Sequence, residues 1–380
     1  DWKQAPFAGS ISALTSAAVL DSDVAVAGYV MPKGEVPKLA VAVLDGASGE
    51  PKFPPFVFAS ETSTWSGEAS GPALAVDPGG SIYVAATVPD GKTTKRVVHQ
   101  LDPETLVDLH SPRYGAPDED ATAITLCQNR VVVVGSVRTA TNPNRYDLRV
   151  WWLSKESGFE LDPPHTFAAP PLEDFSNDFS ERAYGVACVS GEVVVVGTRE
   201  IWPNIKAPKY MRTIVLRFAS PGAEPDVWTS PGDVLAEDAA LAVASTGDGG
   251  FAVTGWTRNK YGTVRQVLTR RFAAGGSPVW PPRPELTADE DATGRALTED
   301  LEGKLIIAAT RKQYLQDTNA WIFAAPDLVS PRTWEKVYNG SSNGPDEALG
   351  LALDSWGYPF AAGAVFEDLQ LRAFAVRLYP

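Results

Sequence analysis

The chain has 380 residues, of which 44% are hydrophobic and 21% are charged, and its formal net charge is −14. This composition excludes a disordered chain, because it supplies enough apolar surface for a core. The acidic excess argues against nucleic-acid binding, which depends on clustered Lys and Arg. Charged or turn residues interrupt every apolar run, so we expect no transmembrane segment.

Residues 237–280 contain the pattern that recurs along the rest of the chain. It starts with an acidic lead segment, Glu237 and Asp238, which is followed by an apolar run and a Gly/Asp turn. A second apolar run, a polar connection, an alternating run and Val279-Trp280 complete the unit. This order predicts four short antiparallel strands.

The same order recurs seven times, and one small residue marks the second strand of each unit. These residues are Gly28, Ala86, Gly135, Gly197, Gly255, Ala309 and Gly363. Repeats of this size, each a four-stranded meander, predict an all-β chain that folds as a seven-bladed β-propeller. We expect residues 1–380 to form a single domain, since the repeat fills the whole chain.

The predicted strands follow one another in chain order. First strands are expected at 11–20, 72–77, 121–127, 183–189, 239–244, 293–298 and 348–354. Second strands are expected at 24–30, 82–88, 131–137, 193–199, 251–257, 304–310 and 358–365. Third strands are expected at 39–44, 97–101, 149–153, 213–218, 266–272, 320–325 and 371–378. Trp228, Trp280 and Trp334 mark fourth strands, and the continuous apolar second strands are typical of sheets covered on both faces.

The two ends of the chain predict how the ring closes. The last unit, 346–380, ends after a third strand, whereas residues 1–10 are similar to the fourth-strand stretch around Trp334. We therefore expect residues 1–10 to pair with 346–380 as the missing fourth strand. Closure of this kind removes open sheet edges, which otherwise promote aggregation.

The repeat resembles that of a known bacterial group. Its features are Asp-Glu-Asp-Ala before the first strand, as at Asp118 and Asp289, a Gly/Asp turn, and Val-x-Gly-x-Thr, as at Val253. A polar loop, an alternating strand and a Trp follow. This phrase is similar to the secreted β-propeller repeats of the SBBP and delta-60 type. The resemblance implies an extracytoplasmic protein, secreted, periplasmic or on the bacterial cell surface, and it transfers no catalytic residue.

In such a fold the fourth-to-first and second-to-third connections share one face, which we call the long-loop face. Long connections are expected there at 59–71, 138–147, 169–181, 199–210 and 311–319. The other connections are tight and define the short-turn face. Because binding residues usually lie on long loops held by a rigid scaffold, we expect a protein or glycan partner on the long-loop face.

Acidic residues precede most first strands, inside a rim of Lys and Arg. The candidate binding residues are Asp118, Glu119, Asp120, Glu237, Asp238, Asp289, Glu290, Asp291, Asp346 and Glu347. They could attract a cation or a basic partner. Alternatively, each carboxylate accepts backbone N–H groups at its own connection, which their recurrence at one repeat position favours. No loop carries the ligand order of a calcium site, so we expect no cofactor, with calcium as a weak alternative.

Aromatic residues in the long connections are a second set of candidates. Trp65, Trp202 and Tyr210 lie in polar stretches and could hold a sugar ring or a peptide. They could equally fold back onto their own loops. The three histidines are far apart in the chain, which argues against a metal site or a Ser/His/Asp triad.

The only two cysteines, Cys127 and Cys188, lie near the ends of the first strands of neighbouring units. A disulfide between them is geometrically allowed, and two buried thiols are the alternative.

Together these features favour a non-enzymatic binding or scaffold protein that is a monomer or one domain of a larger surface assembly. One alternative is a polysaccharide hydrolase or lyase that uses carboxylates at the axial mouth. A lectin-like propeller that binds carbohydrate without turnover is the other.

Overall fold

The computed structural model describes most of the chain. The described residues are 2–7, 11–32, 35–62, 71–139, 145–157, 163–168, 179–201, 210–230, 237–258, 264–279, 283–284, 291–313, 317–325, 332–342, 344–368 and 370–379. They form 28 strands in seven four-stranded antiparallel sheets. Within these ranges no helix is long and apolar enough to cross a membrane.

Each sheet is one blade. In six blades the strands follow the chain order from the ring axis outward, and in the seventh the order is β26, β27, β28 and then β1. The first strands are β2 (Ile11–Leu20), β6 (Ala73–Val76), β10 (Ala123–Cys127), β14 (Phe179–Val189), β18 (Glu237–Ser245), β22 (Asp291–Glu299) and β26 (Glu347–Leu353). The second strands are β3 (Asp23–Met31), β7 (Ile82–Asp90), β11 (Arg130–Arg138), β15 (Glu192–Ile201), β19 (Phe251–Arg258), β23 (Leu305–Gln313) and β27 (Pro359–Glu367). The third strands are β4 (Lys38–Leu44), β8 (Thr93–Leu101), β12 (Tyr146–Ser154), β16 (Tyr210–Phe218), β20 (Gln266–Phe272), β24 (Asp317–Ala325) and β28 (Gln370–Arg377).

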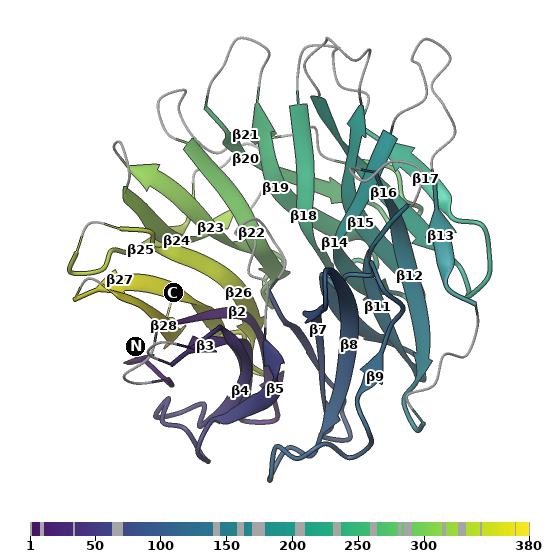
Figure 1. Cartoon of the computed structure of the whole chain (residues 1–380). Coiled ribbons are helices and arrows are strands. Elements are labelled where there is room, and N and C mark those ends of the chain that lie inside the picture. Colours follow the sequence, from purple (N-terminus) through teal and green to yellow (C-terminus); the bar gives the residue numbers. More distant parts are fainter. Residues whose placement is uncertain are drawn as a thin grey trace.

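The fourth strands are short and lie at the rim. They are β5 (Phe56–Thr62), β9 (Arg113–Tyr114), β13 (His165–Phe167), β17 (Asp226–Thr229), β21 (Arg283–Pro284), β25 (Trp334–Tyr338) and β1 (Trp2–Gln4). The first strands of successive blades contact one another, and β2 contacts β26, so the blades form a ring (Figure 1). The predicted seven-bladed β-propeller is confirmed.

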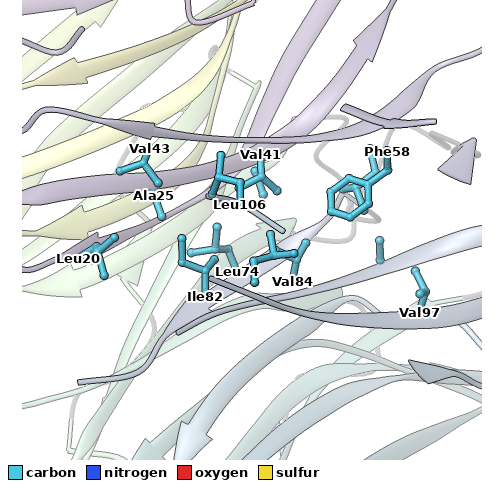
Figure 2. Packing of buried hydrophobic residues seen from close by; sticks show 14 of the residues in the cluster. Leu20, Ala25, Val41, Val43, Phe58, Leu74, Ile82, Val84, Val97 and Leu106 are labelled. Atoms are coloured by element: carbon cyan, nitrogen blue, oxygen red, sulfur yellow. The ribbon is translucent and has the colours of Figure 1, made fainter. Parts of the chain in front are cut away.

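The apolar second strands are buried on both faces because each blade is covered by two neighbours. In β11, Val131 and Val133 pack toward the second blade, whereas Val132 and Val134 pack toward the fourth. Successive side chains of a strand point to opposite faces, so a run of four valines serves both interfaces. Figure 2 shows the corresponding interface of the first and second blades, where Val41 and Val43 meet Ile82 and Val84.

The N-terminal strand closes the ring as the sequence predicts. Trp2, Lys3 and Gln4 pair antiparallel with Arg377, Val376 and Ala375 of β28. This pairing places β1 as the outermost strand of the seventh blade, and both termini lie at that blade (Figure 1).

One predicted fourth strand is described only in part. The sequence marks the outer strand of the fifth blade with Val279 and Trp280, and its described part is β21, where Pro284 pairs with Leu268. An outer strand needs hydrogen bonds on one side only, so it tolerates a proline that lacks an N–H. Val279 lies outside the strand, and Trp280 lies outside the described residues.

The two cysteines are joined by a disulfide. Cys127 ends β10 and Cys188 lies one residue before the end of β14, and their Cα atoms are 5.1 Å apart. The bond links the first strands of the third and fourth blades at their ends near the short-turn face.

Candidate functional site

Five first strands contain a β-bulge at an equivalent position. The bulged residues are Thr15 in β2, Tyr184 in β14, Leu241 in β18, Arg295 in β22 and Leu349 in β26. Pro72 and Thr122 occupy the same position in the second and third blades, directly before β6 and β10. A bulge places an extra residue opposite one partner and redirects its side chain. We call these seven side chains the bulge ring.

The bulge ring lines a cavity of about 220 Å³ on the propeller axis, to which all seven blades contribute. Each first strand follows a fourth-to-first connection and therefore runs from the long-loop face toward the short-turn face. The residues two positions after the bulge, which include Leu74, Ile124, Val186, Val243 and Leu297, line the same cavity roughly 7 Å deeper. The cavity thus has a layer with polar groups toward the long loops and an apolar layer beneath it.

The polar groups of the cavity are unevenly distributed. Thr15 and Thr122 donate their hydroxyl hydrogens to Pro72 O at 2.7 Å and Ala183 O at 2.9 Å. Because a hydroxyl has one hydrogen and two lone pairs, these two oxygens can only accept from a ligand. Donors and charge come from Tyr184 and Arg295.

Among the described residues that line the cavity, Glu347 is the carboxylate, and it is the first residue of β26. Burial raises the pKa of Glu347, and the nearby positive charge of Arg295 opposes that rise. The residues that line the cavity therefore include a guanidinium, a carboxyl group and a phenol, from Arg295, Glu347 and Tyr184.

Four other carboxylates of the lead segments bind backbone groups instead. Asp238 accepts the N–H of Thr213 and the hydroxyl of Ser230, both at 2.6 Å. Asp291 accepts Arg265 N–H at 3.0 Å. Thr213 and Arg265 belong to the third strand of the preceding blade or lie next to it. Each of these two carboxylates therefore joins its blade to the one before it.

Asp120 and Asp346 also accept backbone N–H groups. Asp120 accepts from Ser136 at 2.5 Å, and Asp346 accepts from Gly340 at 2.7 Å and Phe366 at 2.6 Å. These bonds support the structural explanation of the recurring acids over an open acidic mouth.

The remaining described acids of this set form ion pairs with the basic rim. Asp118 contacts Arg138 at 2.7 Å, and Glu237 pairs with Arg258. Glu119 is buried and contacts Arg149 at 2.6 Å and Arg96 at 3.3 Å. These three acids of the expected acidic mouth are therefore paired with basic side chains rather than separated from them.

The aromatic candidates are only partly described. Trp65, Trp202, Asp289 and Glu290 lie outside the described residues. Tyr210 begins β16 and is half-buried, with the Arg212 guanidinium 5.1 Å from its ring centre. The described residues contain no group of three or more His, Cys, Asp or Glu side chains placed to hold a metal ion.

Sequence reasoning missed Tyr184, Arg295 and the two threonines of the bulge ring. The available signal was a large or charged residue within a first strand that is otherwise rich in Ala, Val and Leu. Tyr184 and Arg295 each stand beside a glycine, Gly185 and Gly294, which fits the close packing of backbones at the axis.

No protein-family model matches the sequence, and no curated protein matches it. Solved structures are similar in fold. An ulvan lyase of polysaccharide lyase family 25, solved bound to -[GlcA(1-4)Rha3S]-, has a TM-score of 0.60 at 11% identity and covers 98% of this chain and 95% of its own. The β-propeller domain of the Trilobed protease from Pyrococcus furiosus has a TM-score of 0.53 at 14% identity, with 97% and 96% covered.

The extracellular domains 1-2 of Drosophila Semaphorin 1a have a TM-score of 0.53 at 8% identity, and the match covers 98% of this chain and 87% of that one. At these identities the likeness shows the fold alone. The chain is a seven-bladed β-propeller, and its neighbours in fold include lyases, a protease domain and a semaphorin.

Proposed function

We propose that this chain is a non-enzymatic binding protein that takes the end of a glycan into its axial cavity from the long-loop face. The bulge ring carries this proposal. One structural position, repeated in seven blades, holds Thr, Pro, Thr, Tyr, Leu, Arg and Leu. If the fold alone determined this position, the blades would carry similar residues there, as most of them do at the acidic lead segments.

The size and chemistry of the cavity support a glycan ligand. Its volume of about 220 Å³ is below the range of roughly 300–1,000 Å³ that is typical of drug-sized ligands, so it suits one sugar ring. Hydroxyl acceptors, a phenol, a guanidinium and a carboxyl group lie above an apolar layer. A sugar presents the same combination of hydroxyl groups and apolar C–H faces.

A glycan array and calorimetry on the wild type, Arg295→Ala and Tyr184→Phe test the proposal. We expect the wild type to select a set of glycans and Arg295→Ala to lose at least about ten-fold in affinity. Arg372→Ala is the matched control, because Arg372 is an exposed arginine paired with Asp368 outside the cavity. Absence of any glycan ligand, or binding that is unchanged in both cavity variants, would contradict the proposal.

A second candidate is a lyase that cleaves a polyuronate, and Tyr184 and Arg295 in one cavity favour it. Elimination moves the C5 proton of the uronate to a base, forms a C4–C5 double bond, and expels the C4 oxygen, which then takes up a proton. A deprotonated Tyr184 would take the C5 proton and return it to the departing C4 oxygen, and Arg295 would neutralise the uronate carboxylate.

Incubation with polyuronates, followed by the ultraviolet absorbance of the new double bond, separates the two candidates. If the wild type produces this absorbance and Tyr184→Phe does not, the chain is a lyase rather than a non-enzymatic binding protein. Binding without a new double bond supports the non-enzymatic proposal.

We also propose that the protein is an extracytoplasmic bacterial protein of the SBBP and delta-60 repeat type. The disulfide between Cys127 and Cys188 supports this location, because disulfides persist in oxidising compartments. Alkylation under denaturing conditions followed by mass measurement tests whether the disulfide is present in protein purified from its native compartment. Two labelled thiols would show that it is absent, and the disulfide would then no longer support an extracytoplasmic location.

A further inference from the structure

The short-turn face carries an exposed apolar surface that the proposed function does not use. Leu301 in the β22–β23 turn is 77% exposed, and Trp356 in the β26–β27 turn is 66% exposed. These are the two most exposed large apolar side chains among the described residues. Tyr379, which follows β28, is 43% exposed and packs with its ring centre 4.8 Å from that of Tyr358. We call these four side chains the aromatic patch.

The patch is one continuous surface of two adjacent blades. A Cβ placed on Gly357 would lie 3.2 Å from Leu301 Cγ, so the turn of the sixth blade touches the turn of the seventh. Trp356, Tyr358 and Tyr379 surround the Arg377 guanidinium, with ring centres 5.9, 5.0 and 5.3 Å from it.

Arg377 makes this surface rigid. It is 7% exposed and is held by Asp354 Oδ2 at 2.6 Å and by Gly46 O at 3.3 Å. A buried cation that is fixed by an ion pair and stacked against several rings holds those rings in place. The aromatic patch is therefore preorganised, which lowers the entropy lost when a partner binds.

Acidic residues surround the patch. Asp300 and Glu302 flank Leu301, and the Glu302 side chain is 71% exposed. On the side of the first blade, Gly46 lies against Ser22, which places the exposed Asp21 and the half-buried Asp45 near Arg377. The described bases nearby are already paired, Lys304 with Glu302, Lys52 with Asp23 and Arg377 with Asp354.

We propose that the aromatic patch docks a cationic polypeptide segment of a partner protein. An apolar side chain of the segment covers Trp356 and Leu301, and its Lys or Arg residues face Asp21, Asp45 and Asp300. Exposed Trp and Tyr around an Arg are typical of residues that dominate protein interfaces, and complementary charge selects the partner. A second copy of this chain fits poorly, because a two-fold contact would bring the same acidic rims together.

Two synthetic peptides labelled with fluorescein test the proposal by fluorescence anisotropy. One has the sequence Lys-Lys-Leu-Tyr-Leu-Lys-Lys, and its twin carries Glu in place of every Lys. We expect the lysine peptide to bind, the glutamate peptide not to bind, and affinity to fall as salt rises. No binding by the lysine peptide, or equal binding of both, overturns the proposal.

Variants locate the binding. Trp356→Ser with Leu301→Ser should weaken the lysine peptide about ten-fold or more, because the apolar anchor is lost. Asp21→Asn with Asp300→Asn should reduce both the affinity and its salt dependence, and an asparagine carbonyl at 300 can still accept the N–H groups of Glu302 and Lys304. Two variants are the controls. Val227→Ser removes an exposed apolar side chain on β17, and Arg295→Ala changes the axial cavity. Neither should change the affinity for the lysine peptide.

Two further measurements test whether the aromatic patch instead binds a second copy of this chain or a saccharide. Sedimentation that shows a dimer dissociated by Trp356→Ser would overturn the proposal in favour of self-association. Binding of a neutral glycan that depends on Trp356 would overturn it in favour of a saccharide. The docking proposal is supported if the patch variants lose peptide binding but keep glycan binding. The axial cavity is then a separate site.

Discussion

Asp120 is a carboxylic acid whose pKa the fold raises well above its ordinary value. Burial raises the pKa of Asp120 from 3.8 to about 6, although the Ser136 N–H bond and the charge of Arg182 oppose the rise. In the native state Asp120 thus keeps its proton up to about pH 6, whereas in the unfolded chain it loses the proton near 3.8. Between these values the native state binds more protons, so this group makes the protein less stable as pH rises.

Asp120→Asn should therefore remove a pH-dependent loss of stability. The asparagine carbonyl can still accept the Ser136 N–H, but it carries no charge at any pH. Relative to the wild type, we expect the free energy of unfolding of the variant to rise between about pH 4 and 6, by at most about 3 kcal/mol. Urea unfolding at intervals from pH 4 to 8 measures this difference. A difference that does not change with pH would show that Asp120 does not titrate as described.

Asp45→Asn is the control of opposite sign. Hydrogen bonds from Ser48 hold the pKa of the Asp45 carboxyl below its usual value. Its contribution to stability is therefore present above the unfolded pKa and is lost as pH falls. This variant should lose stability at neutral pH and approach the wild type in acid.

At the scale of single residues, the sequence identified which acids recur but not what they bind. Asp238 and Asp291 reach backbone N–H groups of the preceding blade, and those donors are about 25 residues away in the chain. Only the packing of neighbouring blades brings donor and acceptor together. Recurrence at one repeat position was nevertheless a valid indication of a structural role.

Among the elements, the first strands limit how closely the blades can approach. A Cβ placed on Gly350 in β26 would lie 2.9 Å from the backbone of Ser16 and Ala17 in β2. Gly350→Ala should push the seventh blade away from the first and reduce the free energy of unfolding by about 1–3 kcal/mol. Chemical denaturation of the variant measures this loss.

Gly275→Ala is the matched control for this prediction. A Cβ on Gly275 has nothing within 4 Å, and Gly275 is not among the glycines with positive φ. This change should alter the stability by no more than about 0.5 kcal/mol. If both substitutions change the free energy of unfolding equally, contact between β26 and β2 is not the reason for a glycine at position 350.

The bulges explain why the axial cavity could not be predicted from the chain. The positions of the strands followed from apolar runs and turns, which are local signals. A bulge shifts the alternation of side chains after one residue, so it decides whether Tyr184 or its neighbour faces the axis. That choice depends on the crowding of seven strands that are far apart in the sequence.

For the whole molecule, closure of the ring makes each blade depend on its neighbours. Phe7, which follows β1, is 7% exposed and packs in one cluster with Leu14 and Val24 of the first blade and Phe360 of the seventh. The N-terminal segment therefore contributes both a strand and a core side chain to the junction where the ring is joined. The sequence predicted this closure because the last repeat lacked one strand and the first residues supplied it.

Deletion of residues 1–10 should destabilise the whole ring rather than the seventh blade alone. The deletion exposes the edge of β28 and removes Phe7, whose loss alone should cost about 3–5 kcal/mol. We expect a lower unfolding temperature, and we expect association that increases with protein concentration, since open edges pair with other chains. Calorimetry and light scattering over a concentration series measure both.

Two single substitutions separate the causes of this loss. Phe7→Ala removes the core side chain but keeps the strand, whereas Lys3→Ala removes only the exposed ion pair with Glu367. The first should account for part of the loss and the second for no more than about 1 kcal/mol. If the truncated protein unfolds at the wild-type temperature and stays monomeric, β1 does not hold the ring closed, because an open β28 edge would then have no cost.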